Sequence, residues 1–132
     1  MIVDASVAFK LIVAEPGTEE AMRWLEKEEL AAPALMLSEV ANGLWKRVRR
    51  GELDGFTDIE ARVAALTRLV RISTGAEAAP RALRLAIELD HPVYDCLYLA
   101  LAEANEDRLL TADAKLARIV AGTEHAARVE ML

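Results

Sequence analysis

Short apolar stretches alternate with longer helical segments along the whole chain, and this alternation restricts the possible folds more than any other feature. The apolar stretches are residues 2–3, 30–34, 69–73, 108–112 and 127–131. The segments with helical character are residues 5–14, 19–29, 35–50, 57–68, 76–89, 93–105 and 113–122. Strands that alternate with helices are typical of a parallel sheet with helices on its faces. The sequence therefore predicts an α/β fold, a three-layer α/β/α arrangement with a mainly parallel central sheet of about five short strands.

Turn residues separate these elements. Pro16-Gly17 ends the first predicted helix, and Thr18 is suited to cap the next one. The stretch GELDGFT, residues 51–57, is typical of a turn and precedes the helix predicted for residues 57–68. The sequence contains no internal repeat, linker or low-complexity segment. We therefore expect a single domain that covers residues 1–132, a length that suits one sizeable core.

Composition restricts the location and the partners. No apolar run approaches the roughly 18 residues that a membrane-spanning helix needs, and we expect no cleaved signal and no membrane partner. Because Cys96 is the single cysteine, no internal disulfide is possible, and the expected location is the cytoplasm. The formal net charge of −6 argues against a protein that coats nucleic acid. It does not exclude an enzyme that meets a phosphodiester through metal ions.

Carboxylates stand among apolar neighbours at four places in the sequence. Asp4 and Asp113 each follow a predicted strand, and ligands of open α/β sheets bind at the carboxyl ends of strands. Glu39 and Asp95 lie near the starts of predicted helices that point toward the same edge. If such groups converge, each like-charged pair repels by about 4 kcal/mol at about 4 Å and an effective dielectric constant near 20. A cation between them would be needed to keep all of them ionised.

The residue types indicate which cation this would be. Hard oxygen ligands without His or Cys favour Mg²⁺ or Mn²⁺. The chain has two histidines, neither in a zinc-like spacing, and we interpret His91, which precedes Pro92, as a cap or turn residue. The corresponding chemistry is metal-assisted hydrolysis of a phosphodiester. A structural interpretation stays open for single acids, because Asp113 alone could be only a helix cap and Glu39 alone only a favourable charge near a helix N-terminus.

The order of the stretches around these acids carries further information. In sequence they read MIVDASVAFK, LSEVANGL, VYDCLYLALA and LLTADAKL. In this order and over essentially the whole chain they resemble a PIN domain, specifically a VapC-type toxin ribonuclease. The resemblance implies a parallel sheet flanked by helices, with strand-end acids that bind Mg²⁺ or Mn²⁺ for RNA cleavage. By match, the catalytic and metal-binding residues would be Asp4, Glu39, Asp95 and Asp113, and the supporting residues Ser6, Thr111 and Asn42.

The resemblance also implies partners. Besides an RNA substrate, VapC-type toxins have a cognate VapB-like antitoxin that wraps the toxin and blocks its acidic pocket, and they are usually homodimers. An acidic protein would need local positive charge to hold RNA. Basic side chains that could contact RNA phosphates are Lys10, Lys46, Arg47, Arg49 and Arg50. The alternative for the cluster at 46–50 is a solvated helix end that complements the helix dipole.

Two other functions compete with a ribonuclease. A phospho-receiver signalling domain shares the length, the acidity and the alternation of strands and helices. It needs an acidic pair after the first strand and a phosphorylatable Asp after the third, whereas Asp4 is followed by Ala-Ser and LVRISTG ends without an acid. The other alternative is a PIN-fold binding module without nuclease turnover. Metal binding measured together with RNA turnover would separate such a module from an active nuclease.

Overall fold

The computed structural model of the chain describes residues 1–55 and 58–132. Within these residues, five strands form one sheet in the order β3-β2-β1-β4-β5, and all neighbouring strands are parallel. The strands are β1 (Ile2–Val3), β2 (Ala31–Pro33), β3 (Arg71–Ser73), β4 (Leu109–Thr111) and β5 (Val129–Met131). The predicted parallel sheet of short strands is confirmed.

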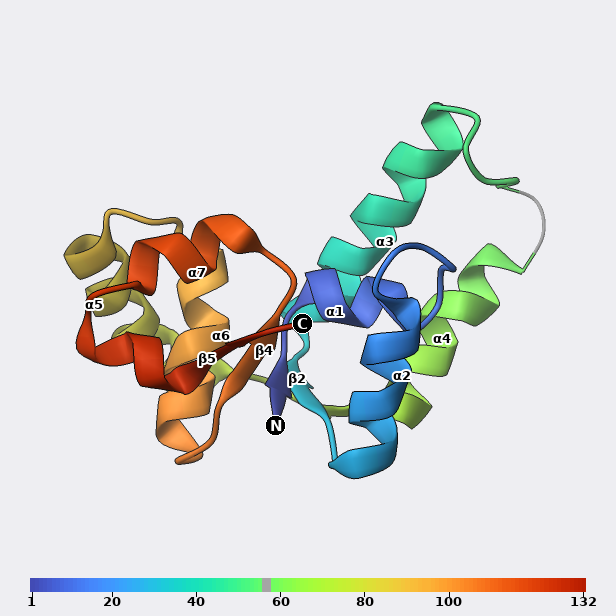
Figure 1. Ribbon diagram of the computed structural model, residues 1–132. Helices are drawn as coiled ribbons and strands as arrows, with labels where there is room; N and C mark the ends of the chain where they lie inside the picture. The colour runs from blue at the N-terminus through green and yellow to red at the C-terminus, as the bar shows by residue number, and fades with distance from the viewer. Residues whose placement is uncertain (56–57) are drawn as a thin grey trace.

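Helices cover both faces of this sheet (Figure 1). One face carries α1 (Ala5–Lys10), α2 (Thr18–Lys27), α3 (Leu35–Arg49) and α4 (Ile59–Leu69), and the other carries α5 (Ala79–Leu89), α6 (Val93–Ala104) and α7 (Ala114–Val120). The two groups follow from the strand order. From β1 the chain adds β2 and then β3 toward one edge of the sheet, whereas β4 and β5 lie on the other side of β1. Crossovers between parallel strands are right-handed, so a reversal of direction moves the helices to the opposite face. The predicted α/β/α arrangement is confirmed.

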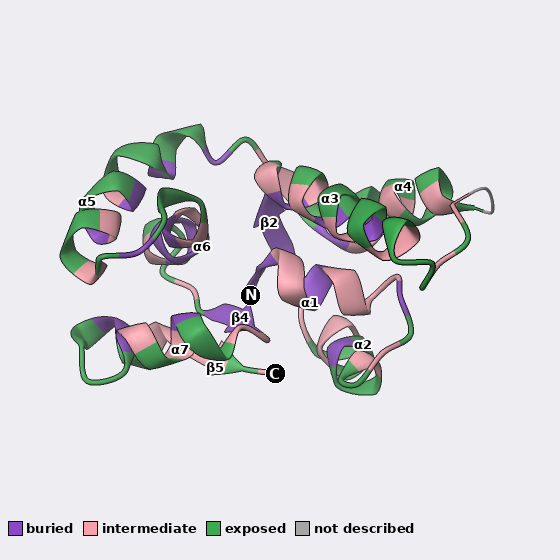
Figure 2. Cartoon of the chain, turned by 90° about the horizontal axis from the view of Figure 1, so that it is seen from above, coloured by how far each residue is buried: buried purple, intermediate pink, exposed green. Residues whose placement is uncertain are grey.

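The core lies on both faces of the short strands (Figure 2). Ile2 and Val3 of β1 and Leu109 and Leu110 of β4 are buried, as expected for strands covered on both sides. Helix α6 packs against β1, β2 and β4 and is buried over most of its length. Since helices run antiparallel to the strands in such units, α1, α3, α6 and α7 all begin at the carboxyl edge of the sheet. This places the helix starts predicted to carry acids side by side.

The first predicted helix is shorter than residues 5–14. Helix α1 ends at Lys10, where the chain turns back on itself. The ammonium of Lys10 donates to Glu15 Oε1 at 2.6 Å and to the carbonyl of Pro16 at 2.9 Å. These contacts stabilise a loop where helical periodicity alone predicted another turn of helix.

The prediction that Thr18 caps the second helix is wrong. Gly17, whose φ of +93° lies in the left-handed region, occupies the N-cap position of α2. The hydroxyl of Thr18 donates instead to the carbonyl of Val13 at 3.1 Å and accepts from the N–H of Glu15 at 3.0 Å. Thr18 therefore closes the preceding loop rather than the helix.

The remaining boundaries differ little from the predictions. Helix α4 begins at Ile59, and residue 57, where the predicted turn ends and the predicted helix starts, lies outside the described residues. The helix predicted for residues 113–122 spans Ala114–Val120. A 3₁₀ turn at Glu124–Arg128 shortens the last strand to Val129–Met131. Another 3₁₀ turn, Ala76–Ala78, leads into α5.

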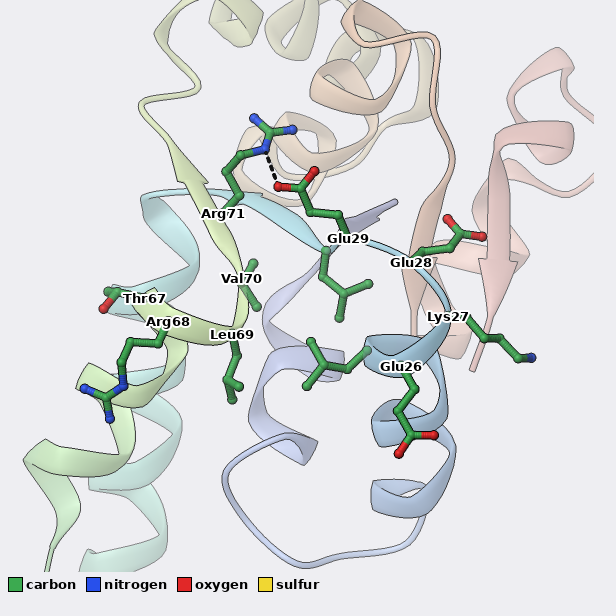
Figure 3. A pocket seen from close by; sticks show the side chains of 11 residues that line it. Glu26, Lys27, Glu28, Glu29, Thr67, Arg68, Leu69, Val70 and Arg71 are labelled. Atoms are coloured by element: carbon green, nitrogen blue, oxygen red, sulfur yellow. Dashed lines mark ion pairs between the residues drawn. The ribbon is translucent and has the colours of Figure 1, made fainter.

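A pocket of about 490 Å³ lies at the amino edge of the sheet, where α2 and α4 end and lead into β2 and β3 (Figure 3). Its lining mixes both signs of charge, and Arg71 Nε lies 3.4 Å from Glu29 Oε1. Since ligands of such folds bind at the opposite, carboxyl edge, this pocket is not the candidate site.

Among the helices of the described residues, none is long and apolar enough to cross a bilayer.

Candidate active site

Carboxylates from four separate segments line one pocket of about 130 Å³ at the carboxyl edge of the sheet. Asp4 directly follows β1, and Asp113 follows β4. Glu39 is the fifth residue of α3, and Asp95 is the third residue of α6. The sheet order changes direction between β1 and β4, which is where open α/β sheets place their ligand crevice. The structure thus brings together all four acids that the sequence singled out.

Asp4 is the most buried of these acids, with an exposed fraction of 7%. Its Oδ1 accepts hydrogen bonds from the hydroxyl of Ser6 at 2.6 Å and from the N–H of Val7 at 3.0 Å. The hydroxyl of Thr111 donates to Oδ2. Burial raises the pKa of Asp4, and these hydrogen bonds oppose the rise. Asp4 is therefore both the N-cap of α1 and part of the lining of the pocket.

The two hydroxyls that contact Asp4 also order the loop after β4. Ser6 Oγ accepts from the N–H of Ala112 at 2.8 Å, and Thr111 Oγ1 accepts from the N–H of Asp113 at 2.9 Å. Asp113 Oδ1 in turn accepts from the N–H of Lys115 at 2.7 Å and caps α7. Ser6 and Thr111, both predicted as supporting residues, thus connect the acids that follow β1 and β4.

Glu39 is held by a tyrosine from the opposite layer. The hydroxyl of Tyr98 in α6 donates to Glu39 Oε2. Burial raises the pKa of Glu39, and the negative charges of Asp95 and Asp4 raise it further. The hydrogen bond from the Tyr98 hydroxyl opposes this rise. Burial and the adjacent Glu39 also raise the pKa of Tyr98, which stays a neutral donor. The sequence analysis missed this contact because the two residues are 59 positions apart.

Asp95 is approached by a buried histidine. Nε2 of His91 lies 2.9 Å from Asp95 Oδ2, and the side chains are 2% and 37% exposed. His91 lies between α5 and α6, at the turn that the sequence indicated, but its ring contact was not foreseen. The spacing of four residues between the two was the available signal. Cys96 is the neighbour of Asp95 in the sequence. Its burial, and to a smaller extent the charge of Asp95, raises the pKa of the Cys96 thiol to about 11, so this thiol is unreactive.

Asn42 is the one predicted supporting residue that the structure places away from the acids. It lies one turn after Glu39 but is exposed, and the pocket is lined without it. The lining is completed instead by Ala5, Ser6, Tyr98 and Leu116.

The donor set fits a hard divalent cation. In residues 1–55 and 58–132, no three His, Cys, Asp or Glu side chains already lie close enough together to hold a metal ion. Mg²⁺ does not require such a cage, because it keeps several waters and binds through one or two carboxylates. The burial and mutual repulsion that raise the pKa of Glu39 would both be offset by a cation in the pocket. The carboxylates that line the pocket are thus oxygen donors of the kind that Mg²⁺ and Mn²⁺ prefer.

A second pocket of about 400 Å³ adjoins the acidic one and shares Ala5, Ser6 and Glu39 with it. We call it the basic groove. Its other lining residues include four of the five basic side chains predicted to contact RNA, namely Lys10, Lys46, Arg47 and Arg50. The fifth, Arg49, is not part of the lining, and its guanidinium lies over the Trp45 ring at 5.0 Å from the ring centre.

The cations of the basic groove differ in their partners. Glu15 pairs with Lys10 at 2.6 Å and also with Arg47. Arg50 is 65% exposed, and its contact with Glu52 is long, at 3.8 Å. Lys46 is exposed on the same helix. Lys10 and Arg47 thus stabilise the loop that carries Glu15, whereas Lys46 and Arg50 present their charge to solvent.

Comparison with known proteins gives consistent results. Residues 1–122 match the family model described as PIN domain. The chain is 37% identical over 120 residues to Ribonuclease VapC3 of Pyrobaculum aerophilum, covering 89% of this chain and 92% of that protein. It is 32% identical over 119 residues to Ribonuclease VapC1 of Mycobacterium tuberculosis, covering 88% of this chain and 87% of that protein.

Solved structures share the fold. A crystal structure of a Pyrobaculum aerophilum protein matches with a TM-score of 0.72 and 24% identity, over 92% of this chain and 84% of that one. A toxin–antitoxin complex from Klebsiella pneumoniae matches with a TM-score of 0.69 and 20% identity, over 98% and 94% of the two chains. At these identities the likeness concerns the fold alone.

Proposed function

The chain belongs to the PIN domain family, and from this premise we propose that it is a divalent-metal-dependent endoribonuclease that acts as the toxin of a toxin–antitoxin pair. Relatives named as VapC ribonucleases match nearly its whole length, so the proposal does not depend on a shared fragment. The observation that carries the proposal is the pocket at the carboxyl edge of the sheet, where Asp4, Glu39, Asp95 and Asp113 meet.

The residues around the pocket hold these carboxylates in place. Ser6 and Thr111 donate to the two oxygens of Asp4, and Tyr98 donates to Glu39. Donors of this kind fix the orientation of a carboxylate and keep it in its ionised form. The chain thus supplies anionic oxygens at fixed places on a small, partly enclosed surface.

Asp4, Asp95 and Asp113, with Glu39, would hold Mg²⁺ or Mn²⁺, a donor set of the kind that these hard cations prefer. When bound, the cation would activate water and stabilise the negative charge that develops at the phosphate. Without such a cation, the acids would repel the phosphodiester of the substrate. The same charges explain why the chain needs separate positive groups to bind RNA.

The basic groove supplies such groups. It opens directly onto the acidic pocket through Ser6 and Glu39, so an RNA strand in the groove would have its backbone beside the acids. Because Glu15 already pairs with Lys10 and Arg47, we assign the main phosphate contacts to two exposed cations, Lys46 in α3 and Arg50 directly after it.

A protein partner is part of the proposal. A chain of the same fold was solved in a toxin–antitoxin complex, and we extend an antitoxin partner to this chain as part of the proposal. An apolar groove of about 300 Å³ between α3 and α4 offers a binding surface. Leu44, Trp45, Val48, Ile59 and Val63 contribute to its lining. Trp45 is 52% exposed, so this groove presents a large aromatic side chain to a partner.

We also propose a homodimer. Exposed apolar side chains gather on α5 and at the start of α6, where Leu83, Ile87, Val93 and Tyr94 are 40% to 76% exposed. Apolar patches of this kind mark protein interfaces. Light scattering after gel filtration would give twice the mass of the chain for the unmodified protein and the monomer mass for Ile87→Glu.

The decisive experiment measures the cleavage of a labelled single-stranded RNA with Mg²⁺ or Mn²⁺ and after chelation by EDTA. We expect metal-dependent cleavage, which Asp95→Asn lowers by at least about a hundredfold while the fold is kept. Asp90→Asn is the matched control. Asp90 is exposed, lies five residues earlier at the end of α5, and has a φ of +49° that Asn tolerates well.

The outcomes separate the alternatives. Full activity of Asp95→Asn, or cleavage that persists in EDTA, would contradict the proposed mechanism. Metal binding without RNA turnover in the unmodified protein would support the PIN-fold binding module instead. Loss of activity in both Asp95→Asn and Asp90→Asn would indicate a general sensitivity of this region and not a role of the pocket.

A further inference from the structure

His91 is a buried histidine whose ring lies beside one of the pocket acids, Asp95. Its side chain is 2% exposed, and Nε2 lies 2.9 Å from Asp95 Oδ2. Within the described residues, Nε2 has no hydrogen bond of regular geometry, so the carboxylate of Asp95 is its nearest acceptor but lies off the direction of the ring N–H. A buried polar nitrogen is costly unless it has a partner, and the carboxylate of Asp95 lies within ion-pair distance of this one.

The backbone fixes where this ring lies. Asp90 ends α5 in a left-handed conformation, with a φ of +49°, and Pro92 restricts the residue before it. The N–H of His91 donates to the carbonyl of Ala86 at 3.1 Å, and the His91 carbonyl lies 3.9 Å from the Cys96 sulfur. The backbone of His91 is therefore held between α5 and α6 by contacts that do not involve Asp95. Its buried side chain approaches Asp95 from this fixed place in the chain.

We propose that His91 is a positioning residue for the metal site. Its Nε2–H holds Oδ2 of Asp95, which leaves Oδ1 for a cation in the acidic pocket. Asp95 is 37% exposed and would otherwise turn freely toward solvent, so a fixed donor makes its metal-binding orientation the preferred one. This inference rests on the proposed function, because it concerns the same pocket.

The chain contains a matched control for this histidine. His125 is also buried, and its Nδ1 lies 3.0 Å from Glu103 Oε1. Glu103 is bound by Arg81 at 2.6 Å, and neither His125 nor Glu103 lines the acidic pocket. Each pair joins a buried ring nitrogen to a carboxylate, Nε2 in His91 and Nδ1 in His125, but only the pair with Asp95 reaches the site.

The test replaces His91 in the full chain by two amide side chains of different length, Gln and Asn. The amide nitrogen of Gln occupies about the place of histidine Nε2, and that of Asn is too short to reach it. Isothermal titration with Mn²⁺ should show an affinity at least about tenfold weaker for His91→Asn, and an affinity within about threefold of the unmodified protein for His91→Gln. His125→Ala removes the contact of Nδ1 with Glu103, so it should lower the melting temperature and leave the Mn²⁺ affinity unchanged.

A second measurement needs no variant. In ¹⁵N-histidine NMR of the unmodified protein, Mg²⁺ should shift the ring signal of His91 and leave that of His125 in place. Equal Mn²⁺ affinity of His91→Asn and the unmodified protein would overturn the inference, as would equal losses in the Asn and Gln variants. If His91→Asn does not fold, an unshifted His91 signal overturns the inference on its own. An unmodified protein that binds no Mn²⁺ would remove the proposed function first and this inference with it.

Discussion

Replacing Thr111 by Val removes a single hydroxyl that connects two of the pocket acids. This hydroxyl donates to Asp4 Oδ2 and accepts from the N–H of Asp113 at 2.9 Å. Thr111 is completely buried, and Val has nearly the same shape, so packing is preserved while the hydrogen bonds are lost. The variant therefore isolates the polar contribution of the connection between β1 and β4.

The magnitude follows from the two bonds. A hydrogen bond to a charged group contributes about 1.5 to 3 kcal/mol, and an ordinary one about 0.5 to 1.5 kcal/mol. The Asp113 N–H is partly exposed, so water replaces part of its lost partner. We expect Thr111→Val to lower the free energy of unfolding by about 2 to 4 kcal/mol near neutral pH.

The loss should depend on pH in a defined direction. Burial raises the pKa of Asp4 above its value in the unfolded chain, and the hydroxyl of Thr111 opposes that rise. Stability linked to Asp4 is thus fully present below the unfolded pKa of about 3.9 and is lost as the pH rises through the folded pKa. Without the hydroxyl, the folded pKa rises further. The deficit of the variant should therefore grow from about 1 kcal/mol near pH 3 to its full size near pH 7.

Urea unfolding followed by circular dichroism measures this deficit. With a slope of about 2 kcal/mol per molar urea, the midpoint near neutral pH should fall by about 1 to 2 M. Thr67→Val is the control, because the Thr67 hydroxyl is exposed and donates only to the Ala64 carbonyl of its own helix, at 2.9 Å. That change should cost less than about 0.5 kcal/mol. A Thr111→Val deficit of the same size near pH 3 and near pH 7 would refute the reasoning.

Three further predictions concern other parts of the chain. Tyr98→Phe removes the donor that opposes the rise in the pKa of Glu39, so the acidic limb of the pH profile of RNA cleavage should move to higher pH. An unchanged limb would exclude a role of the Tyr98 hydroxyl in keeping Glu39 ionised. Gly75→Ala should lower the free energy of unfolding in urea by about 2 kcal/mol, because Gly75 has a φ of +70° and a Cβ there would lie 2.9 Å from a side-chain carbon of β2. For Glu103, burial alone would raise the pKa, but Arg81 outweighs it and holds the pKa below its usual range. The stability that Glu103 contributes is therefore present above the unfolded pKa of about 4.3 and lost as the pH falls through the folded pKa. Glu103→Gln should lower the free energy of unfolding by about 1 to 2 kcal/mol near neutral pH and by almost nothing in acid. Thermal unfolding at several pH values measures this difference.

Local signals in the sequence account for most of the fold and for the place of the acids. Asp4 and Asp113 follow apolar strands directly, so their position at the carboxyl edge depends only on the parallel topology. The end of α1 depends on Glu15, which pairs with Arg47 from a segment 32 residues away. Periodicity within residues 5–14 carries no information about such a pairing, and the predicted helix was therefore too long.

The same distinction explains what was missed at the site. Tyr98 and Glu39 meet only because α3 and α6 come from opposite layers of the sheet, and no local pattern joins them. His91 and Asp95 are four residues apart, so their contact could have been proposed from the sequence. Pro92 between them indicated a turn and concealed the helical spacing. Asn42 matched a family position, yet it faces solvent, because a match in sequence does not determine which side of a helix faces the pocket.

The central claim is that acids from four separate segments bind one divalent metal site. Crystals soaked in Mn²⁺ and measured at an X-ray wavelength where manganese scatters anomalously would test it most directly. We predict an anomalous peak in the pocket at the carboxyl edge of the sheet, within bonding distance of at least two of its acids, Asp4, Glu39, Asp95 and Asp113. A well-occupied peak elsewhere, such as among the acids at the amino edge, with none in this pocket, would contradict the claim.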